Sequence, residues 1–201
     1  MSIARGLVGW WRFDGDLTDA SGSGNDMSLT AGTAAYATGI YGQAFSFNGA
    51  STLAKTSFTP TVNMTGSAWV KAANNSVVGY IFAINNPGSV RRFNLAWIGS
   101  SNVITFAQQP ANKDSSAVFG GTGWVHVAVT LTGQNVSFYK NGQPAGTATL
   151  DGAPDLTSGT LRIGSRDGAV FFNGLIDNAM IYNRALSPSE IKTLYALGSP
   201  L

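Results

Sequence analysis

The sequence has no cysteine and few charged residues, and both features narrow the possible functions. Without cysteine there can be no disulfide, no thiolate metal site and no cysteine nucleophile. Charged residues make up 11% of the 201 residues, well below the usual share of about a quarter. The formal net charge is only +2 and the basic residues are scattered, so the sequence offers no electrostatic footprint for nucleic acid. We therefore expect no nucleic-acid partner.

Long apolar runs are also absent from the sequence. No run approaches the roughly 20 residues that a membrane-spanning helix needs. The N-terminal segment contains Arg5 and Arg12 but no apolar core of signal-peptide length. We therefore expect no insertion into a membrane.

Glycine and short apolar segments dominate what is present. Glycine reaches 25 residues, and 44% of the sequence is hydrophobic. Alternating apolar segments recur about every 8 to 12 residues and are separated by turn signals, of which Asn141-Gly142 is the strongest. This pattern predicts an all-β fold, a two-sheet antiparallel jelly-roll sandwich. No linker or repeat interrupts it, so we expect residues 1–201 to form a single domain. The expected strands lie at 7–13, 43–47, 52–55, 66–71, 77–84, 92–98, 103–108, 124–131, 136–140, 145–150, 160–163 and 175–182.

The last of these strands is followed at once by a helix signal. Ser187 is a natural N-cap, Pro188 suits the first helical position, and Glu190 completes a capping box. These residues predict one short C-terminal helix. The strand before it is apolar apart from Asp177 and its neighbour. Because an unpaired buried carboxylate costs several kcal/mol, Asp177 needs a partner.

Several segments match a known family, in the same order along the chain. They are 7–14 (LVGWWRFD), 19–25 (DASGSGN), 42–49 (GQAFSFNG), 67–71 (SAWVK), 124–129 (WVHVAV), 136–142 (VSFYKNG), 161–164 (LRIG) and the ends of 172–187. In these segments the chain resembles the laminin-G-like domains of the concanavalin A-like jelly-roll superfamily. The resemblance implies a jelly-roll fold and a binding or adhesion module, as in glycan-binding proteins, appendages to glycosidases and bacteriophage virion proteins. It does not name a ligand.

The resemblance also implies one structural Ca²⁺, because many relatives hold one near the loop after the first strand. Here Asp19, Asn25 and Asp26 would supply oxygen ligands. Asp177 would be their long-range partner, because the family pattern brings the closing strand near the first one. The alternative is that these residues serve in Asx-turns and N-caps. Both stay open, although residues 50–52 (AST) stand where many relatives have an acidic residue.

Two regions are candidates for binding a ligand. An aromatic platform with nearby polar donors suits a sugar, and Arg91, Arg92, Phe93 and Trp97 offer that combination. The alternative is that Phe93 and Trp97 form the inward face of a strand. Arg166, in the loop before the closing strand, marks the second candidate region.

A catalytic function has little support in the residues. Glycoside hydrolysis normally uses two positioned carboxyl groups, and the glucan-hydrolysing relatives carry two glutamates on one strand. The only glutamate here is Glu190, which the capping box explains. His126 is the only histidine, and we interpret it as a packed strand residue. We therefore expect that the protein is not an enzyme, with a glycan-active enzyme as the remaining alternative.

Two kinds of binding module remain. The chain begins with Met1 and shows neither signal peptide nor cysteine. We therefore expect an exterior structural, decoration or attachment component of a phage-type virion or similar assembly. Its partners would be capsid or tail proteins and host or mucosal glycans. The alternative is a secreted or cell-surface lectin-like module that binds carbohydrate. Both interpretations place the protein outside the cell or on a virion surface, and its oligomeric state stays open.

Overall fold

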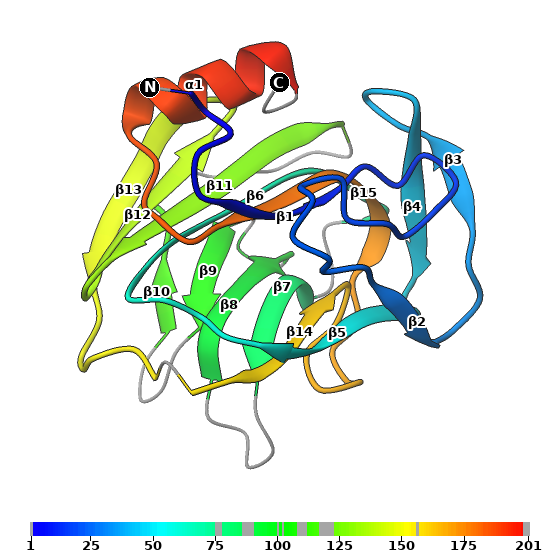
Figure 1. The fold of residues 1–201 in the computed structure, drawn as a ribbon, viewed down its shortest axis with the longest axis horizontal. Helices are drawn as coiled ribbons and strands as arrows, with labels where there is room; N and C mark the ends of the chain where they lie inside the picture. The colour runs from blue at the N-terminus through cyan, green and yellow to red at the C-terminus, as the bar shows by residue number, and fades with distance from the viewer. Residues whose placement is uncertain are drawn as a thin grey trace.

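The structure, a computed structural model, shows two antiparallel β-sheets packed face to face (Figure 1). It describes residues 2–74, 78–85, 91–99, 101, 103–107, 112–116, 123–155 and 157–198, with the backbone alone at 91, 92, 97 and 98. This part of the chain contains 15 strands and one helix. The predicted jelly-roll sandwich with a short C-terminal helix is confirmed.

The first sheet, sheet A, has eight strands. They are β1 (Leu7–Trp11), β3 (Tyr36–Thr38), β4 (Gln43–Asn48), β6 (Asn63–Ala72), β11 (Val125–Thr132), β12 (Asn135–Lys140), β13 (Gln143–Thr149) and β15 (Asn173–Tyr182). Their order is β13-β12-β11-β6-β15-β4-β3, and β1 also pairs with β15. Residues Asn141 and Gly142, which join β12 to β13, both have positive φ, as the predicted hairpin requires.

The second sheet, sheet B, has seven strands. They are β2 (Ser28–Ala31), β5 (Thr52–Phe58), β7 (Val78–Asn85), β8 (Arg91–Ile98), β9 (Val103–Ala107), β10 (Asn112–Asp114) and β14 (Gly159–Ile163). Their order is β10-β9-β8-β7-β14-β5-β2. The short strands β2, β3 and β10 were not predicted from the sequence.

The core lies between the two sheets and is rich in aromatic rings. Trp11 and Phe13 are fully buried in it, whereas Trp10 belongs to a second cluster on the outer face of sheet A. The first strand thus contributes side chains to both faces of sheet A. Trp69 is buried, whereas Trp124 is only partly buried.

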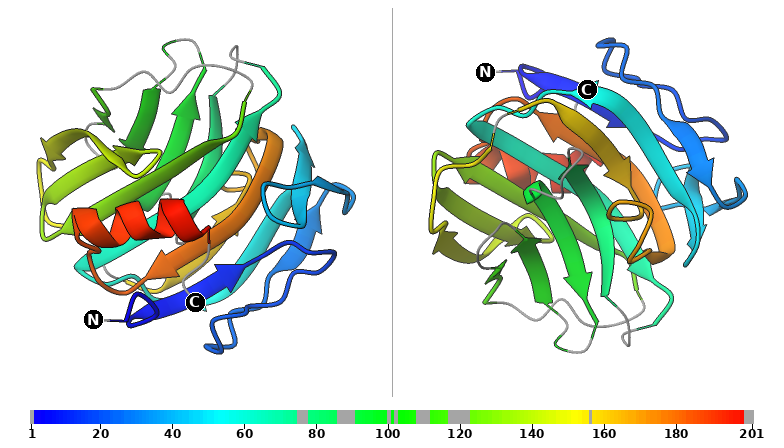
Figure 2. Two further views of the ribbon diagram at one scale, coloured as in Figure 1. Left: turned by 90° about the horizontal axis from the view of Figure 1, so that it is seen from above. Right: turned by 90° about the horizontal axis from the view of Figure 1, so that it is seen from below.

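Helix α1 (Pro188–Leu197) covers part of the outer face of sheet A (Figure 2). Its buried residues, Ile191 and Leu194, pack in the same cluster as Trp10. Ser187 caps the helix within a capping box, and Gly198 ends it in the left-handed conformation. The predicted N-cap and capping box are confirmed. The described residues include no helix long and apolar enough to cross a membrane.

Strand β15 joins the two ends of the chain. It lies between β6 and β4 at its start and pairs with β1 at its end. Trp10 lies opposite Met180, and Trp11 opposite Ala179. The expected neighbourhood of the first and closing strands is thus confirmed.

Candidate functional site

A pocket of about 340 Å³ opens where the two ends of the chain meet, and we call it the seam pocket. It collects residues from β1, from the β3–β4 turn, from β15 and from the C-terminal end of α1. Its lining residues are Trp10, Arg12, Asp14, Tyr41, Gly42, Asn178, Leu197 and Gly198. Two of them are unusually open for apolar side chains, since Tyr41 is 42% exposed and Leu197 is 53% exposed.

A β-bulge in β15 builds the floor of the seam pocket. The pairing of β15 with β6 shifts by one residue between Asp177 and Met180. Within this bulge Asn178 has a φ of 47°, in the left-handed region. Asparagine tolerates that region better than most residues, and such bulges re-aim side chains next to functional sites. Here the bulge turns the Asn178 amide toward Trp10, whose Nε1 donates to Asn178 Oδ1 at 2.9 Å.

The neighbouring carboxylate of Asp177 holds the β3–β4 turn. It is fully buried, and its Oδ2 accepts the backbone N–H groups of Ile40 at 2.8 Å and Tyr41 at 3.1 Å. Its Oδ1 accepts the Nδ2 of Asn178 at 2.9 Å. These are the partners that the sequence required. Asp177 and Asn178 together therefore position both aromatic residues of the pocket, Tyr41 and Trp10.

The same environment perturbs the acidity of Asp177. Burial raises the pKa of its carboxyl group to about 6, and the nearby Asp14 carboxylate adds to that rise. The hydrogen bonds from Tyr41, Ile40 and Asn178 oppose it by favouring the charged form. Burial outweighs them, so a substantial fraction of this carboxyl group is protonated in mildly acidic solution.

The ring of Tyr41 is held from two sides while one face stays open. It packs edge-on against Trp69, with ring centroids 6.4 Å apart. A side-chain carbon at Gly198 would collide with the Tyr41 ring, so only glycine lets the end of α1 approach this closely. The exposed ring is therefore held in place before any ligand arrives, which lowers the entropy cost of binding.

Charged groups form the rim of the seam pocket. Arg12 pairs with Asp14 at 2.8 Å, with 56% and 33% of the two side chains exposed. The Arg12 guanidinium also lies over the Trp10 ring, 5.7 Å from its centroid. Asp14 in addition accepts the backbone N–H of Gln43 at 2.9 Å. The rim thus offers hydrogen-bond donors and acceptors beside an apolar ring and carries no net charge.

Of the residues predicted to form sites, only Asp177 contributes here, and it supports the pocket from behind. Sequence reasoning did not identify Trp10, Arg12, Tyr41 or Leu197 as site residues. One signal for Arg12 and Asp14 was available, because they follow the first strand, which was expected beside the closing strand. Tyr41 gave no such signal, since it lies in a turn whose position depends on a carboxylate 136 residues away.

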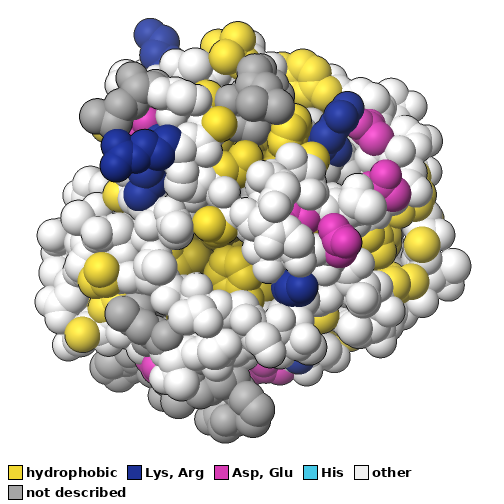
Figure 3. All heavy atoms as spheres, viewed as in Figure 1, with side chains coloured by type: hydrophobic (Ala, Val, Ile, Leu, Met, Phe, Trp, Pro, Cys, Tyr) yellow, Lys and Arg dark blue, Asp and Glu magenta, His cyan; other side chains and the backbone are white. Residues whose placement is uncertain are grey.

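The loop after β1 brings three of the predicted calcium ligands together but uses them for hydrogen bonds. Figure 3 shows acidic side chains gathered over this loop. Asp19 accepts the backbone N–H groups of Trp10, Ser21 and Asn25, each at 2.9 Å. Asp26 accepts the N–H of Asp19 at 2.8 Å. These contacts match the Asx-turn alternative.

The fourth predicted calcium ligand does not join the loop. Asp177 faces the β3–β4 turn, and the described residues contain no group of three or more histidines, cysteines, aspartates or glutamates placed to hold a metal. The donor set implied by the resemblance is thus not gathered at one point, so we assign Ca²⁺ no part in the seam pocket. Calcium binding by this protein stays a prediction.

The predicted ligand-binding residues lie away from the seam pocket. Phe93 is 1% exposed and packs against Phe106 in the core, with ring centroids 5.3 Å apart. Its ring is therefore on the inward face of the strand, the alternative raised from the sequence. The side chains of Arg91, Arg92 and Trp97 lie outside the described part of the structure. Arg166 is partly exposed and lies over the ring of Tyr80, 5.5 Å from its centroid.

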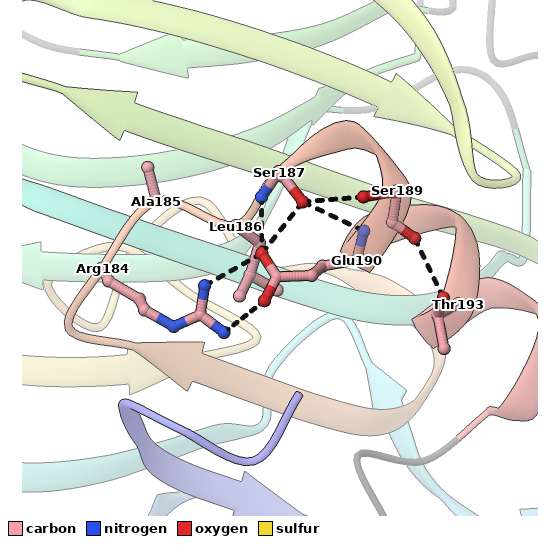
Figure 4. Close-up of a pocket in the computed structure, with 7 residues that line it drawn as sticks. All are labelled: Arg184, Ala185, Leu186, Ser187, Ser189, Glu190 and Thr193. Atoms are coloured by element: carbon pink, nitrogen blue, oxygen red, sulfur yellow. Dashed lines mark hydrogen bonds and ion pairs between the residues drawn. The ribbon is translucent and has the colours of Figure 1, made fainter. Parts of the chain in front are cut away.

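A larger crevice, of about 680 Å³, runs along the start of α1, but its charged groups are already paired (Figure 4). Arg184 makes a bidentate ion pair with Glu190, at 2.9 Å and 2.7 Å. Glu190 also accepts the backbone N–H of Ser187. These bonds, led by that from Arg184, lower the pKa of Glu190 to about 2, so it stays ionised and is unsuited to act as a general acid.

His126 is a packed strand residue, as predicted. It is 2% exposed, its Nε2 lies 2.8 Å from Ser67 Oγ, and its Nδ1 is buried without a partner. Burial lowers the pKa of its imidazole to about 3. The imidazole is therefore neutral at physiological pH and closed to a substrate.

Comparisons with known proteins agree with this architecture. Domain 4 of AbnA, an extracellular arabinanase of glycoside hydrolase family 43 from Geobacillus stearothermophilus, was solved in complex with arabinotriose. It superposes with a TM-score of 0.79 at 23% identity, over 94% of this chain and 98% of that domain. The binding domain of botulinum neurotoxin DC, solved with rat synaptotagmin II, gives a TM-score of 0.77 at 15% identity, over 98% of this chain. The binding domain of Paraclostridial Mosquitocidal Protein 1 gives 0.72 at 16% identity, over 96% of this chain. This chain spans about half of each of these two toxin binding domains, 53% and 52%.

A family profile gives the same answer at the level of sequence. Residues 45–192 match the laminin-G-like profile described as the concanavalin A-like lectin/glucanases superfamily. The match covers most of the chain, from β4 to the first half of α1. The chain therefore belongs to the laminin-G-like family of the concanavalin A-like lectin/glucanases superfamily.

Proposed function

We propose that the protein is a non-catalytic carbohydrate-binding module and that its ligand binds in the seam pocket. The observation that carries this proposal is the exposed Tyr41 ring, fixed beside the Arg12–Asp14 pair. An aromatic ring covers the apolar face of a sugar, while charged and amide groups hydrogen-bond its hydroxyl groups. Related folds that bind sugars support the proposal: the arabinanase domain was solved with arabinotriose, and a botulinum neurotoxin type C depends on two ganglioside molecules for cell entry.

The charge and size of the seam pocket favour a short neutral glycan. Asp14 balances the charge of Arg12, so the rim has no excess charge to hold an acidic group. A volume of about 340 Å³ is at the low end of the range of about 300 to 1,000 Å³ for ligand pockets. We therefore propose one end of a neutral oligosaccharide as the ligand. A binding module of this kind acts outside the cell, as the related arabinanase does.

The perturbed groups of the described residues support a binding role over catalysis. A glycosidase needs an acid and a base or nucleophile that both reach the substrate. Asp177 is fully buried, Glu190 is held by Arg184, and His126 is enclosed beneath α1. None of the three is open to a sugar in the seam pocket.

The experiment is a glycan array followed by calorimetry on the glycans that bind. Tyr41→Ala removes the ring and is expected to weaken binding about fivefold or more, since an aromatic contact contributes about 1 kcal/mol or more. Tyr41→Phe keeps the ring and should bind nearly as well as the wild type. Val62→Ala is the matched control, because Val62 is similarly exposed, at 44%, and lies outside the pocket. A blank array, or saturable binding that Tyr41→Ala leaves unchanged, would refute the proposal.

A position on a virion exterior, with capsid or tail partners, stays a prediction from the sequence. A virion protein with this fold could use the same seam pocket to attach to glycans. The gene neighbourhood tests it directly: adjacent capsid or tail genes support a virion component, and adjacent polysaccharide-degradation genes support a secreted module.

A further inference from the structure

A group of charged side chains outside the seam pocket lies at the connection between β14 and β15. Figure 1 shows this connection on the side of the molecule opposite α1. The cluster consists of Arg162 on β14, Arg166 and Asp167 on the connection, and Tyr80 on β7, and we call it the arginine cluster. It carries two guanidinium groups for a single carboxylate.

The ion pairs of the arginine cluster are loose. Arg162 Nη1 lies 3.7 Å from Asp167 Oδ1, and Arg166 Nε lies 3.9 Å from Asp167 Oδ2. Both distances exceed that of a hydrogen bond, so the Asp167 carboxylate pairs with the two guanidinium groups by charge alone and accepts a hydrogen bond from neither. Arg166 Nε is buried and has no hydrogen-bond partner in the structure. Its Nη1 makes one long contact, 3.5 Å, with the Tyr80 hydroxyl. The Arg166 guanidinium is therefore incompletely hydrogen-bonded, and since its Nε is buried, its Nη groups are the donors that a ligand can reach.

The backbone that carries Arg166 is rigid and strained. Arg166 and Ala169 exchange two backbone hydrogen bonds, at 2.9 Å and 2.7 Å, around Asp167 and Gly168. Asp167 has a φ of 54°, and the β-branched Val170 has a φ of 53°, which is rare for such a residue. Strain of this kind persists where surrounding contacts impose it, and it clusters at ligand-binding loops. The arginine cluster is therefore held in place before a ligand arrives.

We propose that the arginine cluster binds the carboxylate of an acidic sugar, with Arg162 and Arg166 as donors. Each guanidinium presents a planar fork of N–H groups that matches a carboxylate. In the free protein Asp167 serves as a loose internal counter-ion, and the ligand carboxylate takes the hydrogen bonds that Asp167 does not make. The geometry alone argues for a carboxylate. That the carboxylate belongs to a sugar rests on the proposed carbohydrate-binding function.

The two binding sites complement each other chemically. The seam pocket has a neutral rim and an open aromatic ring, whereas the arginine cluster has an excess positive charge. No residue is shared between them. The module would thus hold neutral and acidic sugars at two separate sites, so a substitution can remove one site and leave the residues of the other in place.

The test is titration with glucuronate, followed by NMR, with glucose as the uncharged probe of the same ring. We expect saturable shifts with glucuronate near Arg166 and none there with glucose. Arg166→Gln should weaken glucuronate binding at least about tenfold, because it removes charge-assisted hydrogen bonds. Arg166→Lys keeps the charge and loses the fork, so its effect should be intermediate. Asp167→Asn removes the competing carboxylate at a position asparagine tolerates, and should strengthen binding about threefold or more.

The increase with Asp167→Asn is decisive, because a merely structural role for the arginine cluster would give no increase. Tyr41→Ala is the matched control and should leave glucuronate binding unchanged while it weakens neutral glycans. Two results would overturn the proposal. One is that glucose and glucuronate cause equal NMR shifts near Arg166, and the other is that the Asp167→Asn variant binds glucuronate no more tightly than the wild type. Tighter binding of an acidic peptide than of glucuronate would overturn the sugar as the occupant. If glucuronate binds and no neutral glycan does, the proposed binding of glycans in the seam pocket is refuted, whereas the proposed binding of a carboxylate by the arginine cluster is supported.

Discussion

The buried imidazole of His126 sets a testable dependence of stability on pH. In the folded protein burial lowers its pKa to about 3, whereas in the unfolded chain it titrates at about 6.5. Below about pH 6.5 the unfolded chain takes up a proton that the folded protein does not. His126 therefore destabilises the fold as the pH falls, and its contribution is fully favourable only above the unfolded pKa. The loss is about 1.4 kcal/mol per pH unit, or about 3 kcal/mol at a pH two units below 6.5.

Asp177 acts in the opposite direction over part of the same range. Its pKa is raised to about 6 in the folded protein, so the folded state binds more protons than the unfolded chain between that value and the ordinary value of 3.8. Its contribution to stability therefore grows as the pH falls through that window. The wild-type curve alone would hide both effects, because they oppose each other.

A comparison of the wild type with His126→Gln isolates the histidine. The glutamine amide can reach Ser67 as Nε2 does, and Asp177 is unchanged, so its effect cancels in the difference. The free energy of unfolding, measured by urea denaturation from about pH 7.5 to about pH 4.5, gives the test. The variant is expected to be less stable at neutral pH, because it loses the ring contacts with Trp69 and Tyr195. The gap should then shrink by about 1.4 kcal/mol for each pH unit below 6.5. Parallel curves would refute the buried, neutral imidazole.

Three further measurements test other parts of the structure. Asp177→Ala leaves the N–H groups of the β3–β4 turn and the amide of Asn178 without their acceptor. We expect it to lower the free energy of unfolding by about 3 kcal/mol or more, and an unchanged urea midpoint would contradict that role. Ser187→Ala removes the N-cap of α1 and should cost about 1 kcal/mol, whereas Ser23→Ala, in an exposed loop, should cost nothing measurable. For the predicted Ca²⁺, the melting temperature is measured with chelator and after calcium is restored. An ion of useful affinity raises it reversibly, and equal midpoints would exclude one.

The strands predicted from the sequence agree with the structure where a strand is buried on both faces. They also agree where apolar and polar residues alternate clearly along the strand. The three strands that were not predicted, β2, β3 and β10, all lie at sheet edges. An edge strand is short and largely exposed, so it needs little apolar alternation and leaves a weak signal. Helix α1 was predictable to its caps, because those signals are local in the sequence.

The seam pocket was only partly predictable, for the opposite reason. The need of Asp177 for a partner followed from its place in an apolar strand. The identity of that partner did not, because two backbone N–H groups in a distant turn carry no side-chain signature. The exposure of Tyr41 depends in turn on where that carboxylate holds the turn. Long-range polar contacts of this kind depend on the assembled fold, so no local sequence pattern predicts them.

The place of β15 in sheet A has a consequence for how the protein folds. It is the last strand in the chain, yet it lies in the middle of the sheet, paired with β6, β4 and β1. During synthesis, those three strands are made long before the strand that joins them. Until β15 arrives, they present unpaired edges that invite association with other chains, and pairings this distant in sequence form slowly. Sheet A is therefore completed only when β15 pairs with these strands, late in synthesis. Chains that end before residue 173 are expected to aggregate.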